Sequence, residues 1–270
     1  MSDRDFDVLS ILNNLESVDM IQALMGNKCL GIYFKNDTAE LYFNSGFRKQ
    51  MNIKLDKLLK DQSIKWVWKT QAREDWHLTW QNHFKPVMID DKLAVIPYWK
   101  NDHLAEITIK IKPGMAFGTG HHETTWLMLK QMLKYLQPGM SVLDLGSGSG
   151  ILSIAARKIG AEKVDSVEFD IECKANFYEN LELNGIKEEI QFHNVDVLNW
   201  TKLDYDLILA NMNQNIIEKL IPLLKKIDGT FLLSGLLDKN FDTIKQLCQR
   251  YQLQVKEKLV KGEWICLAIG

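Results

Sequence analysis

The sequence lacks the features that mark membrane-spanning, secreted and disulfide-stabilised proteins. No apolar run approaches the roughly 20 residues that a helix needs to cross a bilayer. The first residues are polar and acidic, without the basic region and apolar run of a signal peptide. The four cysteines form no CxxC pair and have no histidine at zinc-finger spacing. We therefore expect free thiols in a reducing compartment, no membrane association and a cytoplasmic location.

An excess of basic charge is also lacking. The chain has 33 Lys and Arg residues against 35 Asp and Glu, a formal net charge of -2. Dedicated nucleic-acid binders usually carry a strong basic excess or stripe, so we expect no direct nucleic-acid partner. The hydrophobic fraction of 46% and the charged fraction of 25% are typical of a soluble globular protein. A length of 270 residues suffices for a catalytic domain with a smaller partner domain.

The patterns divide the chain into three stretches. Residues 1–62 combine helical apolar spacing at 18–25 and 53–59 with a β-hairpin at 30–43, which predicts a small α+β domain for recognition. Residues 63–112 are interpreted as a linker that leads into the catalytic domain. Five tryptophans in this linker either bury apolar area where two units meet or line a substrate groove. They are Trp66, Trp68, Trp76, Trp80 and Trp99.

Residues 113–270 alternate strands and helices, which predicts a parallel sheet with helices on both faces. The expected strands are 141–145, 163–169, 190–195, 205–210 and 230–233. The expected helices are 124–136, 151–159, 171–184 and 241–251. Two further runs, 253–259 and 264–269, form a closing hairpin. This α/β arrangement resembles the seven-stranded, Rossmann-like sheet of class I methyltransferases.

A glycine-rich turn gives the strongest chemical signal. Gly146, Gly148 and Gly150 follow the strand that contains Asp144, and a helix begins directly after them. Ligands of open α/β sheets bind at such turns, and glycine lets a ligand approach the backbone closely. A dinucleotide fingerprint needs Gly or Ala where this chain has Ile151. The turn therefore favours S-adenosylmethionine over a nicotinamide dinucleotide, with Gly146 and Gly148 as cofactor contacts.

Acidic side chains follow the next two strands. Glu168 ends the second strand, where a carboxylate can accept hydrogen bonds from both ribose hydroxyls. Asp170 is the alternative for this role, or it caps the following helix. Asp196 follows the third strand, where its side chain can reach the adenine edge.

The fourth strand ends in Ala210-Asn211-Met212-Asn213, where a polar residue faces the methyl group. Enzymes that methylate nucleobases and glutamine amides typically carry Pro-Pro and an aromatic residue after the Asn or Asp. Their absence here favours an aliphatic amine as the acceptor. His122-Glu123 resembles the start of HExxH, but Trp126 stands where the second histidine should be, so we expect no metal.

The segment from Met115 to Thr125, MAFGTGHHETT, resembles the hallmark of ribosomal protein L11 methyltransferases. The resemblance extends over residues 63–270 and includes 144–150, Ala210-Asn211, 233–235 and 262–264. It is least for residues 1–62. Two departures from the family pattern are Glu168, where Asp is usual, and Met212, where Ile or Leu is usual.

The resemblance implies methylation of the α-amino group and of lysine ε-amino groups of ribosomal protein L11, with S-adenosylmethionine as the methyl donor. We also expect the enzyme to be a monomer. It implies cofactor contacts at Thr125, Gly146, Glu168 and Asn211, and Phe117 is placed to cover the cofactor. Asn211 is the candidate to orient the amine, and His121 and His122 are candidate proton acceptors, although local loop structure explains these histidines equally well. A lysine methyltransferase for another protein, an RNA or small-molecule methyltransferase and a non-catalytic assembly factor are the alternatives.

Overall fold

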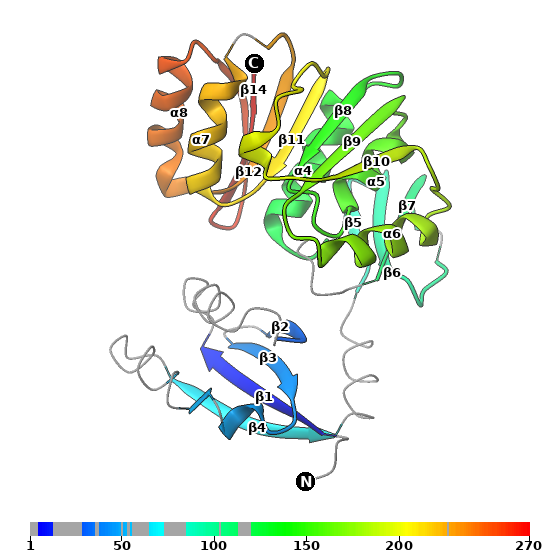
Figure 1. Ribbon diagram of the computed structural model, residues 1–270, viewed down its shortest axis with the longest axis vertical. Helices are drawn as coiled ribbons and strands as arrows, with labels where there is room; N and C mark the ends of the chain where they lie inside the picture. The colour runs from blue at the N-terminus through cyan, green and yellow to red at the C-terminus, as the bar shows by residue number, and fades with distance from the viewer. Residues whose placement is uncertain are drawn as a thin grey trace. The chain divides into compact units, whose positions relative to one another are not determined.

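The computed structural model divides into two compact units, Met1–Lys85 and Pro86–Gly270, which are drawn in Figure 1. It describes residues 5–12, 29–35, 38–49, 51–52, 55, 65–72, 85–102, 104–112, 120–225 and 227–270. The predicted helix at 18–25 lies outside these residues, and of the predicted helix at 53–59 only residue 55 lies within them.

The first unit contains a four-stranded antiparallel sheet in the order β2-β3-β1-β4. Its strands are β1 (Asp5–Leu12), β2 (Gly31–Lys35), β3 (Thr38–Asn44) and β4 (Trp66–Ala72). The pairing of β2 with β3 confirms the predicted hairpin. Trp68 of β4 is buried and its ring centroid lies 5.7 Å from that of Phe43. This tryptophan therefore belongs to the core of the first unit, while Trp76 and Trp80 lie outside the described residues.

The predicted linker at 63–112 is divided between the two units. Its strand β4 pairs with β1, so it belongs to the first unit. The strands β5 (Val87–Ile89), β6 (Leu93–Pro97) and β7 (Ile107–Ile111) form a small sheet in the second unit. Their apolar side chains share one core with helices α4 (Glu123–Tyr135) and α5 (Ile151–Ile159). The observed division at Lys85/Pro86 therefore differs from the predicted boundaries at 62 and 112.

The second unit is built on a seven-stranded sheet in the order β10-β9-β8-β11-β12-β14-β13, which confirms the predicted fold class. Pairs among the first five strands of this order are parallel, and β14 and β13 add an antiparallel hairpin. The strands are β8 (Ser141–Leu145), β9 (Lys163–Glu168), β10 (Ile190–Asn194), β11 (Leu207–Asn211), β12 (Thr230–Leu237), β13 (Val255–Lys261) and β14 (Trp264–Ile269).

Helices cover both faces of this sheet (Figure 1). Helices α4, α5 and α6 (Cys173–Leu183) pack into one apolar core, and α7 (Gln214–Leu224) and α8 (Phe241–Arg250) pack into the other. A one-turn 3-10 helix, η3 (Val197–Asn199), follows β10, and a second, η4 (Asp238–Asn240), precedes α8. Helix α7 was not anticipated, although its buried Ile217, Leu220, Ile221 and Leu224 follow helical spacing. Among the described residues, no helix is long and apolar enough to cross a membrane.

The parallel strands β8 to β11 bring their carboxyl ends to one edge of the sheet. Glu168 and Asn211 are the last residues of β9 and β11, and the turns after β8 and β10 contain the glycine-rich run and Asp196. Ligands of open α/β sheets bind at this edge. The topology therefore brings residues from separate parts of the sequence to one place.

Candidate functional site

The glycine-rich turn after β8 has a backbone that only glycine accommodates well. Gly146, Gly148 and Gly150 have φ angles of 75°, 50° and 82°, in the left-handed region. A Cβ on Gly146 would lie 2.9 Å from Sδ of Met212, and one on Gly150 would lie 2.8 Å from the ring of Phe177. Helix α5 begins directly after Gly150 without a side-chain cap. Its first N–H groups are thus left for a ligand or solvent at the edge of the sheet.

Asp144 lies beneath this turn and is fully buried. Its Oδ2 accepts a 2.5 Å hydrogen bond from the Ser153 hydroxyl, which lies 2.7 Å from the Ser166 hydroxyl. Its Oδ1 has no hydrogen-bond partner among the described residues. Burial raises the pKa of Asp144 to about 7, although the hydrogen bond from Ser153 acts in the opposite direction. Asp144 therefore changes charge near neutral pH directly below the proposed cofactor turn.

Glu168 faces the glycine-rich turn from the end of β9. Its Oε2 accepts a 2.9 Å hydrogen bond from the N–H of Gly148, and its Oε1 accepts one of 2.9 Å from the N–H of Asp170. Asn194 at the end of β10 donates to the carbonyls of Glu168 and Phe169, at 2.8 and 2.9 Å. Each carboxylate oxygen retains a further lone pair for a ligand hydroxyl. Of the two acids considered for that role, Glu168 is therefore the one joined to the turn.

Asp170 and Asp196 hold local backbone. Asp170 accepts a 2.9 Å hydrogen bond from the N–H of Glu172, in the turn that leads into α6. The N-cap of α6 is Glu172, without a side-chain capping bond, so the alternative prediction that Asp170 caps this helix is wrong. Asp196 caps η3 by accepting a 2.9 Å hydrogen bond from the N–H of Leu198. The adenine contact proposed for Asp196 stays a prediction.

Phe169 is a candidate that sequence reasoning missed. Its side chain is 73% exposed and directly follows Glu168 at the carboxyl edge. Large apolar side chains that remain in solvent beside a site are candidates for ligand contact. The available signal was an aromatic residue placed immediately after the acid that ends a strand.

Asn211 ends β11 next to the glycine-rich turn. The pairing of β11 with β8 runs to Ala210 and Leu145, so Asn211 and Gly146 leave neighbouring strands together. The N–H of Met212 donates to the carbonyl of Ser234 at 3.1 Å. Gly235 has a φ of 86°, and a Cβ there would lie 2.0 Å from the carbonyl oxygen of Met212. The backbone after Asn211 is thus tightly packed, which fixes where this side chain leaves the strand.

The remaining candidates belong to the first turn of α4 and to the residues before it in the sequence. Thr125 is fully buried, and its Oγ1 finds no hydrogen-bond partner among the described residues. His121 is exposed. His122 is the N-cap of the helix and accepts from the N–H of Thr124. Phe117 lies at 113–119, outside the described residues.

Buried polar atoms left without partners fit a bound ligand at this edge. Six side-chain atoms in the described part of the chain are buried without hydrogen-bond partners, and three of them are Thr125 Oγ1, Asp144 Oδ1 and Ser147 Oγ. All three lie in the glycine-rich turn, directly before it, or in the first turn of α4. Buried polar groups are normally hydrogen-bonded, so unpaired ones indicate a partner that completes them. Within those same residues, no group of three His, Cys, Asp or Glu side chains is arranged to hold a metal.

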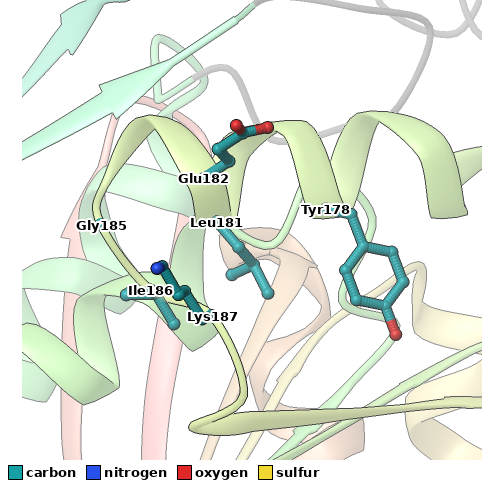
Figure 2. A pocket seen from close by; sticks show the side chains of 6 residues that line it. All are labelled: Tyr178, Leu181, Glu182, Gly185, Ile186 and Lys187. Carbon is teal, nitrogen blue, oxygen red and sulfur yellow. The ribbon is translucent and has the colours of Figure 1, made fainter.

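A pocket of about 320 Å³ lies apart from this edge. Figure 2 shows the residues that line it: Tyr178, Leu181, Glu182, Gly185, Ile186 and Lys187. They come from the second half of α6 and the turn before β10. Since α6 begins at the carboxyl edge and leads back to the start of β10, this pocket does not contribute to the candidate site.

The fold and the site together define a class I methyltransferase: a seven-stranded sheet with an antiparallel closing hairpin, and a glycine-rich turn faced by an acid. The model of the family "Ribosomal protein L11 methyltransferase (PrmA)" matches residues 12–270. The chain belongs to this family, and it is therefore a methyltransferase enzyme that acts on a protein and uses a methyl donor.

Two relatives and one solved structure illustrate the similarity. A ribosomal protein L11 methyltransferase from Dictyoglomus turgidum is 33% identical over 220 residues, 80% of this chain and 73% of the relative. One from Prochlorococcus marinus is 34% identical over 246 residues, 83% of this chain and 81% of the relative. The crystal structure of a ribosomal protein L11 methylase from Lactobacillus delbrueckii subsp. bulgaricus matches with a TM-score of 0.65 and 32% identity. This match covers 69% of this chain and 98% of that one.

Proposed function

We propose that this protein transfers methyl groups from S-adenosylmethionine to ribosomal protein L11, at lysine ε-amines and the N-terminal α-amine. One observation carries the proposal. Glu168, the glycine-rich turn and the strand end at Asn211 meet at one edge of a methyltransferase sheet. Family membership supports the choice of substrate.

The residues at this edge fit S-adenosylmethionine. Glu168 would accept hydrogen bonds from the ribose hydroxyls, while Gly146 and Gly148 allow the ligand to approach the backbone. The Thr125 hydroxyl would bind the methionine portion. Phe117 would cover the ligand, and Asp196 would reach the adenine. When bound, this cofactor supplies a methyl group on a positively charged sulfur.

The acceptor must arrive as a neutral amine. A lysine side chain has an ordinary pKa near 10.4 and an α-amine one of about 7.7–8, so the lysine must first lose a proton. Burial of the amine in an apolar site favours its neutral form. The side-chain carbonyl of Asn211 would orient the amine for in-line attack, and His121, which is exposed, is the candidate proton acceptor. Most of the rate gain would then come from positioning.

The remaining parts of the proposal concern partners and place. We propose that the N-terminal recognition domain captures L11, that the enzyme works as a monomer without a nucleic-acid partner, and that it acts in the cytoplasm. The nearest alternative is a lysine methyltransferase for a different protein, because the catalytic residues would be the same.

One experiment tests the candidate protein and RNA substrates together. Purified large-subunit ribosomal proteins and ribosomal RNA are incubated with the enzyme and S-adenosylmethionine that carries a labelled methyl group. The proposal predicts label in L11 alone. Label in another protein would support the nearest alternative, and label in RNA would support an RNA methyltransferase. If no label is transferred although calorimetry shows that the enzyme binds S-adenosylmethionine, the substrate assignment fails.

A further inference from the structure

The tip of the closing hairpin contacts the beginning of α4. The ring centroids of Trp264 and His122 lie 5.0 Å apart at an interplanar angle of 65°, an edge-to-face arrangement. Beside this pair, Nζ of Lys261 lies 4.6 Å from the centre of the Trp126 ring. A Cβ built on Gly262 would lie 3.9 Å from Cγ of Glu123. Three residues around the hairpin turn, Lys261, Gly262 and Trp264, thus lie against the N-cap and first turn of the helix.

His122 caps the helix with the ring that Trp264 contacts. Its Nδ1 accepts from the N–H of Thr124 at 3.3 Å and lies 2.8 Å from the Thr124 hydroxyl. The first N–H groups of a helix have no partner within it, and a capping side chain satisfies one of them. The orientation of the His122 ring therefore determines whether the N-terminus of α4 is capped.

The residues before α4 make a second close contact. Gly120 has a φ of 87°, and a Cβ there would lie 2.9 Å from Cγ1 of Val95.

Thr124 and Thr125, which follow the cap, are buried. The hydroxyl of Thr125 has no partner in the described part of the chain. The capped turn therefore holds a hydroxyl that is ready to accept or donate one hydrogen bond to a ligand.

We propose that Trp264 is a positioning residue for the methyl donor and acts through His122. The edge-to-face contact holds the His122 ring in its capping orientation, the cap fixes the first turn of α4, and this turn places the Thr125 hydroxyl against the donor. The inference rests on the proposed function, because it takes S-adenosylmethionine as the ligand of this edge.

The experiment measures binding of S-adenosylmethionine to the full-length enzyme by calorimetry. Trp264→Leu keeps an apolar side chain but removes the aromatic edge, and we expect it to weaken binding about fivefold, the equivalent of a typical helix cap. Trp264→Phe should restore most of the affinity, because it restores an aromatic edge. His122→Asn replaces the capping ring nitrogen with a side-chain oxygen that can also cap the helix, so this variant should bind the donor more tightly than His122→Ala.

Coupling between the two residues separates positioning from general stability. In the double variant Trp264→Leu/His122→Ala, the loss of affinity should be close to that of His122→Ala alone, since Trp264 acts only through the histidine. With donor at saturation, the turnover number of Trp264→Leu should stay within about twofold of the wild type, while its KM rises.

A matched control comes from a second histidine–tryptophan pair. The rings of His193 and Trp200 lie 4.6 Å apart, next to a 2.6 Å hydrogen bond between His193 Nε2 and Asp165. Trp200→Leu should leave donor affinity unchanged. The inference fails if Trp264→Leu folds and binds the donor like the wild type, or if the two single losses simply add. If the wild type itself binds no S-adenosylmethionine, the proposed function has failed instead.

Discussion

At the scale of single residues, the site depends on close backbone approaches. Gly235 leaves no room for a side chain, because a Cβ would lie 2.0 Å from the carbonyl oxygen of Met212. That carbonyl belongs to the residue after Asn211, the proposed amine-orienting side chain. Sequence reasoning identified Asn211 from its place at a strand end. It could not find the contact with Gly235, which depends on the pairing of β11 with β12.

Gly235→Ala should therefore lower the free energy of unfolding by more than the ordinary cost of placing alanine in a left-handed backbone conformation. Gly139 is a matched control, because its φ of 88° is nearly the same and a Cβ there meets no atom within 4 Å. Gly139→Ala should cost about 1–2 kcal/mol, the ordinary cost of a left-handed residue. Gly235→Ala should cost several times more in urea denaturation and should also weaken donor binding. If the two variants lost the same unfolding free energy, the backbone of Met212 would have to move away from the new Cβ at little cost, which would contradict this prediction.

Asp144 gives the protein a predictable dependence on pH. Its pKa rises from 3.8 to about 7 on folding, so the folded state favours the protonated carboxyl. The resulting stabilisation is complete below about pH 4 and is lost as the pH rises to about 7. Between pH 5 and pH 8, we expect the free energy of unfolding to fall by about 1–3 kcal/mol on this account, since one pKa unit corresponds to about 1.4 kcal/mol.

Asp144→Asn supplies the comparison, because it keeps the shape and cannot ionise. Its unfolding free energy, measured by urea denaturation at several pH values, should change less over this range than that of the wild type. If the unfolding free energies of the two proteins changed with pH by the same amount, the raised pKa of Asp144 would be contradicted.

At the scale of elements, α6 connects the small sheet to the glycine-rich turn. Asn180 is fully buried, accepts from the N–H of Lys112 at 2.8 Å and donates to the carbonyl of Ser149 at 2.9 Å. One turn later, Asn184 accepts a hydrogen bond from the N–H of Lys110 at 2.9 Å and donates one to the carbonyl of Lys110 at 2.7 Å. Both side chains hold β7 and its end, but of these bonds only that from Asn180 to Ser149 reaches the turn.

Asn180→Ala and Asn184→Ala should therefore differ in function. Each leaves backbone groups without a partner, and we expect each to lower the unfolding free energy by about 1–3 kcal/mol. Only Asn180→Ala should also weaken binding of S-adenosylmethionine, because it releases the carbonyl of Ser149. Calorimetry that found equal affinities for both variants would show that the turn does not depend on α6.

Elements with local signals were predictable, and those defined by distant partners were not. The strand at 141–145 and the helix at 151–159 are observed at the predicted bounds. Strands β1 and β4 were missed, because their pairing joins Asp5 to Ala72 and no short pattern records it. Asn194 was noticed only as part of a strand end. Its role in holding Glu168 depends on backbone carbonyls from another strand.

At the scale of the whole molecule, topology explains why the site could be anticipated at all. Parallel strands end at one edge, so residues at the ends of four strands were expected to meet. The link between Glu168 and Gly148 and the adjacent positions of Asn211 and Gly146 agree with that expectation. The division between the two units was harder to predict, because the tryptophan-rich stretch supplies strands to both.

The proposed function requires this edge of the sheet to methylate amines of ribosomal protein L11. Its most direct test is intact-protein mass spectrometry of purified, unmethylated L11 after incubation with S-adenosylmethionine and either the wild type or Asn211→Ala. We expect mass gains in steps of one methyl group with the wild type, and a strong reduction of these gains with Asn211→Ala even when the donor is saturating. An unchanged mass of L11 with a wild-type enzyme that binds S-adenosylmethionine would contradict the proposed function.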